Sequence, residues 1–264
     1  MGSASRGALA ASKAELTVLG GAADLATGEQ LFEAARVLEG SSQLRSALSD
    51  PSADQSAKQA LVSRIFATFG EPAKRLLHTI AGARWSSAED LVAGIEEVGV
   101  RAIVSSAPAG VSIERELHAF GTAVASDPEL ELALGSKLSA SASKVQLVQR
   151  LLEGKAAQQT ITILRQLIAH PRGRRIPELL RFASGVVADQ GGFSIATVTV
   201  AAPVAPAQLD RLRSALAKQY GRSIEINLVV EPALIGGMRV QVADDVIDGS
   251  IAARLQDLKL QLAS

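Results

Sequence analysis

The sequence predicts an α+β protein that is predominantly helical, with a duplicated N-terminal helical bundle followed by a small C-terminal β-α-β-β-α module. Over most of the first 190 residues, apolar residues recur at spacings of three and four, which is typical of amphipathic helices. Two long stretches of this helical region match one another in register. Beyond residue 191, apolar and polar residues alternate in short runs, as half-buried strands require.

The helical region is expected to open with a helix over residues 5–19 and to be divided by proline and glycine. Asp50-Pro51 and Asp127-Pro128 predict turns, because a residue before proline disfavours the helical conformation. The run 70–72, Gly-Glu-Pro, predicts a helix start, and the run 171–173, Pro-Arg-Gly, predicts an interruption late in the region. These breaks give helices of ordinary length for a bundle.

Thirteen positions of the helical region recur further along the chain at an almost constant offset. The offset is 86 residues for the first seven and 88 for the last six, so a two-residue insertion near Gly154-Lys155 separates the two groups. Matches at apolar positions alone would be the coincidence of two helical stretches, but three pairs are polar, which favours duplication. The pairs are Leu44/Leu130, Ala47/Ala133, Leu48/Leu134, Lys58/Lys144, Leu61/Leu147, Val62/Val148, Arg64/Arg150, Leu76/Leu164, Ile80/Ile168, Ala81/Ala169, Arg84/Arg172, Leu91/Leu179 and Val98/Val186.

The C-terminal module is predicted to run strand, helix, strand, strand, helix. Residues 193–200 are rich in β-branched side chains, Pro203 and Pro206 introduce a helix, and Gly221 ends it. Residues 224–230 and 238–242 alternate as strands and are expected to pair with each other, with Gly236 and Gly237 at positive φ in the connector. A tight acidic turn is then expected before a terminal helix. We therefore divide the chain into domains at 1–105, 106–190 and 191–264.

Composition limits the classes of function. Hydrophobic residues make up 47% of 264 residues, enough for substantial cores, and 27 basic residues balance 27 acidic ones. That balance removes the broad positive field by which nucleic-acid binders gather phosphate, so a DNA or RNA role is disfavoured. There is no cysteine and no apolar run long enough to span a bilayer. We expect a protein that is soluble, or peripheral to a membrane.

The predicted terminal helix carries the main candidate binding site. Its apolar residues follow a heptad-like seam at spacings of four, three and four: Ile251, Leu255, Leu258 and Leu262. The seam could pack on its own sheet or dock helices of a partner, and one helix can do both. Asp248 or Ser250 is expected to cap the helix, whereas Asp244, Asp245 and Asp248 lack the spacing of a calcium loop.

Other polar features give weaker signals. Arg172, Arg174 and Arg175 could touch anionic lipid, nucleic acid or an acidic partner, but a solvated turn between helices is the simpler interpretation. The three histidines, His78, His118 and His170, lack metal-ligand spacing, and Trp85 is expected to be a packing anchor. Gly20-Gly21 and Gly191-Gly192 do not form a phosphate loop, and no catalytic arrangement is recognisable. We expect no cofactor and no metal.

Residues 234–240 and 246–255 carry a resemblance to a known family. The Gly236-Gly237 pair, the turn formed by Asp248, Gly249 and Ser250, and Arg254 followed by leucine resemble the C-terminal signature of the delta subunit of bacterial F-type ATP synthases. The mitochondrial relative is the oligomycin-sensitivity-conferring protein. Typical delta subunits carry one helical bundle, so the duplicated region resembles the elongated form that we associate with actinobacteria.

The resemblance implies a non-catalytic stator subunit of the peripheral stalk. The N-terminal helices would receive the N-terminal helix of an alpha subunit in a groove, and the C-terminal module would hold subunit b. It leaves open which of the two copies meets the catalytic head. The protein would lie at the cytoplasmic face of the bacterial cell membrane, reaching the membrane only through the complex. The alternative is a helical-repeat scaffold for an unrelated protein partner, and an enzyme ranks third.

Overall fold

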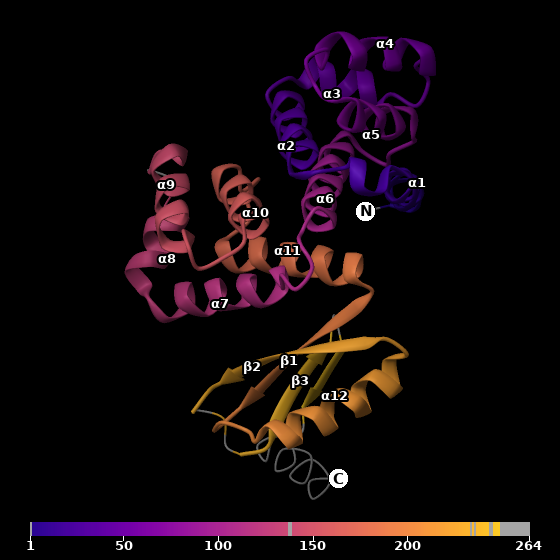
Figure 1. Ribbon diagram of the computed structural model, residues 1–264. Coiled ribbons are helices and arrows are strands. Elements are labelled where there is room, and N and C mark those ends of the chain that lie inside the picture. The colour runs from indigo at the N-terminus through magenta and orange to yellow at the C-terminus, as the bar shows by residue number, and fades with distance from the viewer. Residues whose placement is uncertain (1, 137–138, 233, 235, 243–244, 249–264) are drawn as a thin grey trace, which may run out of the picture. The chain divides into compact units, whose positions relative to one another are not determined.

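The computed structural model describes residues 2–136, 139–232, 234, 236–242 and 245–248, and confirms a predominantly helical α+β fold. In these parts of the chain twelve α-helices and a short 3-10 helix accompany one four-stranded sheet (Figure 1). The helices are α1 (Ser3–Leu19), η1 (Gly20–Ala22), α2 (Leu25–Glu39), α3 (Ser42–Ser49), α4 (Gln55–Ile65), α5 (Glu71–Gly82), α6 (Ala88–Ser105), α7 (Ile113–Ser126), α8 (Pro128–Gly135), α9 (Ser141–Leu152), α10 (Gln158–Ala169), α11 (Ile176–Gly191) and α12 (Pro206–Tyr220). The strands are β1 (Phe193–Val200), β2 (Ser223–Val230), β3 (Met238–Val242) and β4 (Asp245–Asp248).

Contacts group the chain into two compact units, Met1–Val187 and Ala188–Ser264. The first unit holds the helical region and the second holds the sheet. The further division of the first unit near residue 105 stays a prediction, as do the three domain boundaries as a set.

Helices α2 and α6 pack closely at the centre of the first helical copy, which runs from α2 to α6, because glycines let their backbones approach. A Cβ on Gly28 would lie 2.8 Å from the carbonyl oxygen of Gly99 and 2.3 Å from a side-chain carbon of Ile103. Leu31, on the same face of α2, is fully buried. Interior packing is close to that of a crystal, so such contacts leave no room for even one added carbon.

The helix starts follow the local sequence. Asp24 caps α2 by accepting a hydrogen bond from the Thr27 amide at 2.8 Å, and the Thr27 hydroxyl accepts from the Asp24 amide in return. Asp127 caps α8, in which Pro128 holds the first position, where a missing N–H costs nothing. Gly70 precedes α5 as expected. Short polar side chains thus satisfy amides that a helix cannot bond internally.

The two helical copies have corresponding elements. Helices α3 and α8 begin 86 residues apart, as do α4 and α9, whereas α6 and α11 begin 88 residues apart. The corresponding residues are buried alike: Leu48 and Leu134 are both at 2% exposure or less, and even Lys58 and Lys144 are both buried. Burial thus follows the offsets read from the sequence, with α2–α6 as one copy and α7–α11 as the other.

The second unit packs α12 against a mixed sheet of order β2-β1-β3-β4 (Figure 1). Strand β1 pairs parallel with β2 through the crossover helix α12 and antiparallel with β3. Val198 and Val200 of β1 and Leu216 of α12 are buried together in its core. Pro206 lies in the first turn of α12, and Gly221 ends the helix in the left-handed conformation with φ of 66°, both as predicted.

The predicted pairing of residues 224–230 with 238–242 is wrong. Strand β3 pairs with β1 instead, and β2 is left at an edge of the sheet. The chain leaves β2 past the end of β1, where the Glu231 amide donates to the Val200 carbonyl oxygen at 2.8 Å. The positive φ values of Gly236 and Gly237, 64° and 79°, fit the predicted connector. The connector therefore joins β2 to a strand on the other side of β1, so the backbone of β1 is hydrogen-bonded along both edges.

The predicted acidic turn is also wrong, since Asp245–Asp248 forms strand β4, antiparallel to β3. Asp248 lies opposite Arg239, and its Oδ2 is 3.3 Å from the Arg239 Nε. Opposite charges on facing strands favour this pairing. Asp248 therefore forms a cross-strand ion pair, while the alternative cap, Ser250, lies outside the described residues.

Candidate protein-interaction site

The predicted partner-binding seam cannot be compared with the described structure. Ile251, Leu255, Leu258 and Leu262 lie outside the described residues, as do Gly249, Ser250 and Arg254 of the signature. Of that signature the structure describes Gly236 and Gly237, in the connector, and Asp248, at the end of β4. The seam therefore stays a prediction.

Apolar side chains are exposed on both edge strands of the second unit. Val229 and Val230 end β2 with 38% and 45% exposure, and Val246 and Ile247 of β4 are exposed by 57% and 43%. Such side chains on edge strands are suited to contact with another chain. A hollow of about 490 Å³ adds apolar surface between the end of β1, the start of α12 and the start of β3, and it includes Val200, Val204 and Met238.

Residues 171–175 form a turn between α10 and α11, as the sequence predicts, but two of its three arginines are bonded to a buried carboxylate. Glu96 of α6 is only 3% exposed, and its carboxylate forms ion pairs with two arginines of this turn. Arg172 Nη1 lies 3.3 Å from its Oε2, and Arg174 Nη2 lies 2.5 Å from its Oε1. Arg174 also lies 4.7 Å from the ring centre of Phe182. A buried carboxylate with two charged donors is a structural contact inside the protein, so Arg172 and Arg174 are engaged within the fold, whereas Arg175 stays exposed.

Further polar contacts join the two helical copies. Arg36 Nη1 of α2 donates to Gln166 of α10 at 2.6 Å, and the Gln159 amide nitrogen donates to the carbonyl oxygen of Ser106 at 3.2 Å. His170, at the end of α10, has a pKa lowered by burial and by the nearby positive charge of Arg36. The junction between the copies is therefore bonded at several points.

Trp85 is a packing anchor, as the sequence indicated. It is 4% exposed, and its indole N–H donates to the Ile80 carbonyl oxygen at 2.8 Å. Its ring lies against Gly94, where an added Cβ would be 2.1 Å from the nearest ring carbon. Only glycine at position 94 leaves room for the Trp85 ring to be buried against α6.

Two features of the described side chains bear on metal binding and nucleophilic chemistry. No group of three or more histidine, cysteine, aspartate or glutamate residues in the described ranges is placed to hold a metal ion. His78 is 3.1 Å from the Ser63 hydroxyl, a pair without the oriented third group of a nucleophilic site. Among the described helices, none has the length and apolar character to cross a membrane.

Sequence reasoning missed the role of Glu96, although a signal was present. Val92 and Gly99 lie four residues before and three residues after it, and both are buried, so helical spacing places Glu96 on the inner face of α6. A lone carboxylate on an apolar face requires a charged partner. The partner was not predictable because Arg172 and Arg174 lie 76 and 78 positions further along the chain.

The fold and its contacts define a class: a predominantly helical protein of two compact units, with buried charged contacts in the helical unit and exposed apolar side chains on the edge strands of the sheet. Comparison with known proteins agrees. The family model "ATP synthase delta (OSCP) subunit" matches residues 101–262. An ATP synthase subunit delta of Leifsonia xyli is 54% identical over the whole of both chains. Others, from Acidothermus cellulolyticus and Kineococcus radiotolerans, are 40% and 39% identical, covering 90% of this chain and 88% and 87% of theirs.

The chain belongs to the ATP synthase delta (OSCP) subunit family, whose members are non-catalytic structural subunits of that complex. The family resemblance predicted from the C-terminal signature is thereby confirmed. The matched range takes in the second helical copy and the sheet unit, so α1–α5 lie outside it.

Proposed function

We propose that the protein is the peripheral-stalk subunit that joins the catalytic head of an F-type ATP synthase to subunit b. The observation that carries this proposal is the similarity to ATP synthase delta subunits over the full length of the chain. In this role it prevents the head from rotating with the central rotor, so that proton transport stays coupled to ATP synthesis. It acts at the cytoplasmic face of the bacterial membrane and reaches the membrane only through the complex.

The two ends of the chain divide the task. The helical region receives the N-terminal helix of an alpha subunit, because packed helices leave grooves that an amphipathic helix fills. The C-terminal module holds subunit b through the seam of Ile251, Leu255, Leu258 and Leu262. The exposed apolar edges of β2 and β4 support a protein-binding role for this module.

A stator must resist torque, and the junction between the helical copies is consistent with that demand. Glu96 ties α6 to the turn after α10 through two arginines, and Arg36 ties α2 to α10. Buried, hydrogen-bonded charge pairs require specific geometry, so bending at this junction would leave charges unpaired. Duplication then lengthens the adaptor while the ion pairs and hydrogen bonds at the junction hold the two copies together.

Binding of purified partners tests whether the helical region contacts the catalytic head and the C-terminal module contacts subunit b. The full chain with Leu255→Asp and Leu258→Asp is compared with the wild type and with Leu132→Asp, a control at a leucine that is 72% exposed on α8. We expect the seam variant to bind the soluble part of b at least about tenfold more weakly and the catalytic head unchanged, because charge on an apolar seam opposes burial. The control should bind both normally.

Unchanged binding of b by the folded seam variant would place the b contact elsewhere. A folded wild-type chain that binds neither b nor the head would overturn the stator proposal and favour a scaffold for an unrelated partner. Circular dichroism of each variant establishes that it is folded.

A further inference from the structure

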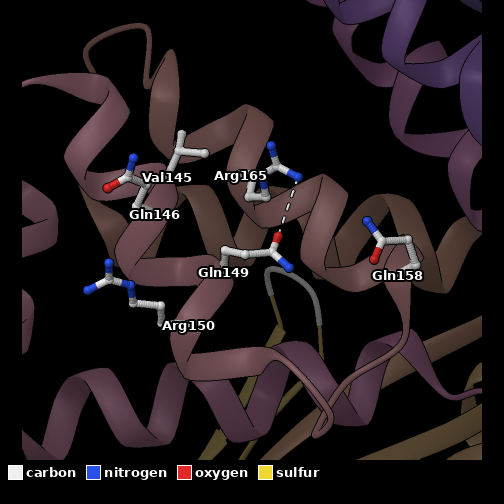
Figure 2. A pocket seen from close by; sticks show the side chains of 6 residues that line it. All are labelled: Val145, Gln146, Gln149, Arg150, Gln158 and Arg165. Atoms are coloured by element: carbon white, nitrogen blue, oxygen red, sulfur yellow. Dashed lines mark hydrogen bonds between the residues drawn. The ribbon is translucent and has the colours of Figure 1, made fainter.

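A polar groove between α9 and α10 of the second helical copy contains an arginine that is incompletely hydrogen-bonded. The groove, of about 340 Å³, is lined by Val145, Gln146, Gln149 and Arg150 of α9 and by Gln158 and Arg165 of α10 (Figure 2). Two of these six residues are basic and none is acidic. The groove therefore has a local positive charge in a chain whose net charge is zero.

Arg165 at the centre of the groove is incompletely bonded. Figure 2 shows its guanidinium pointing toward Gln149, whose side-chain oxygen accepts from Nη1 at 3.4 Å, the long limit of a hydrogen bond. Its Nε is buried and has no hydrogen-bond partner. A buried donor without an acceptor is costly, and native structures keep few of them. Arg150 extends to the other side of Gln149 in the same view and forms no ion pair with any described residue.

The first helical copy has an apolar side chain at the position that corresponds to this arginine. The offset of 88 that relates Leu76 to Leu164 places Leu77 at the position of Arg165. Leu77 is 2% exposed and packs in the core of the first copy. The same helix pair is therefore built with a leucine in one copy and with an incompletely bonded arginine in the other. The arginine lowers the stability of the second copy unless something binds it.

We propose that the α9–α10 groove binds an aspartate or glutamate side chain presented by an acidic segment of a partner protein. The planar fork of arginine matches a carboxylate with two parallel hydrogen bonds. Gln146, Gln149 and Gln158 bring amide donors and acceptors, which can bond the peptide groups on either side of an acidic residue.

Other anionic ligands fit the groove less well. A nucleic-acid strand needs a broad positive surface and aromatic side chains for base stacking, and the lining has two basic residues and no aromatic one. The site does not depend on the stator role, because it follows from the lining of the groove alone. It defines a further contact, distinct from the seam of the C-terminal module.

Nuclear magnetic resonance of the 15N-labelled full chain tests the site directly. The probes are a capped tetraglutamate peptide, its tetraglutamine counterpart, inorganic phosphate and a short oligothymidylate. We expect saturable shifts of the Arg165 Nε–H and of the Gln149 and Gln158 side-chain amides with tetraglutamate, and none with tetraglutamine. Added salt should weaken binding, because the contact is between charges.

Variants separate binding from folding. Arg165→Leu restores the residue of the first copy, so it should unfold at the same temperature as the wild type or higher while binding tetraglutamate at least about tenfold more weakly. Arg64→Gln, the counterpart of Arg150 in the first copy, should bind normally. The proposal is overturned if both peptides bind alike, if phosphate or oligothymidylate binds more tightly than tetraglutamate, or if Arg165→Leu binds normally or melts well below the wild type.

Discussion

Glu96→Gln tests whether the ion pair at the junction holds the two helical copies together. The substitution keeps the volume of the side chain but removes its charge, so Arg172 and Arg174 lose their shared carboxylate. Removing one partner of a buried ion pair costs about 3–5 kcal/mol, whereas an exposed pair contributes about 0–1 kcal/mol. Glu96 is buried, but the two arginine side chains keep 19% and 22% exposure, so their charges stay partly solvated. We therefore expect a loss of about 2 kcal/mol in the free energy of unfolding.

Urea denaturation followed by tryptophan fluorescence measures this loss. Trp85 is the single tryptophan, and it is buried in the same helical copy as Glu96. Hydrogen exchange of residues 171–175 reports the turn itself, whose amides should exchange faster in the variant. Arg84→Ala is the matched control, because Arg84 occupies the position of Arg172 in the first copy and is exposed. It should change stability by less than about 0.5 kcal/mol. A loss no larger than this in Glu96→Gln would refute the role of the ion pair.

Three further changes test other parts of the account. Gly94→Ala should destabilise by about 1–3 kcal/mol in urea, because its Cβ meets the Trp85 ring; wild-type stability would show that the ring can move aside. Asp24→Ala should cost about 1 kcal/mol, since the Thr27 amide loses its acceptor. That hydrogen bond lowers the pKa of Asp24 below 3.8, so its contribution is present above this pH and is lost on acidification; an unchanged acid-unfolding midpoint in the variant would contradict it. Burial lowers the pKa of His170 below 6.5, so the unfolded chain binds more protons than the folded one and stability falls as pH drops below about 6.5. His170→Gln should remove this fall. Melting temperatures of the variant and the wild type that decrease equally with pH would contradict the role of His170.

The helical part of the fold could be predicted because its signals are local or repeated. Caps such as Asp127-Pro128 fix where helices begin, and the recurrence of Lys58 at Lys144 and Arg64 at Arg150 indicates duplication from the sequence alone. The offset of 88 also pairs Arg165 with Leu77, so a charged residue of the second copy stands where the first copy has an apolar one. Repetition in one sequence therefore supplied an internal comparison.

The sheet order could not be predicted from the sequence in the same way. Alternation identifies a strand and its buried face, but it does not say which strand is its neighbour. Strand β1 takes β2 and β3 on its two sides because the connector after Glu231 passes its end, which is a tertiary feature. The two aspartates of strand β4 predict a solvent-exposed turn, whereas in the structure Asp248 is bonded to Arg239 across the sheet.

The candidate sites also divide into those that the sequence alone indicates and those that only the packed structure reveals. A seam of four apolar residues at heptad spacing is legible in the sequence, and so is a family signature. The Glu96 junction and the α9–α10 groove are not, because each depends on residues brought together by packing. In both cases a side chain of the wrong polarity for its helical position was the only local sign: Glu96 on the inner face of α6, and Arg165 where the first copy has Leu77.

The central claim is that this subunit couples the catalytic head to the stalk, and ATP-driven proton pumping tests it most directly. Membrane vesicles and catalytic head, both stripped of this subunit, are combined with the purified full chain, and acidification of the vesicles is followed after ATP is added. We predict that the full chain restores pumping, and that a chain ending at Asp248, which keeps β4 but lacks the seam, does not. Failure of the folded full chain to restore pumping, while ATP is still hydrolysed, would contradict the claim.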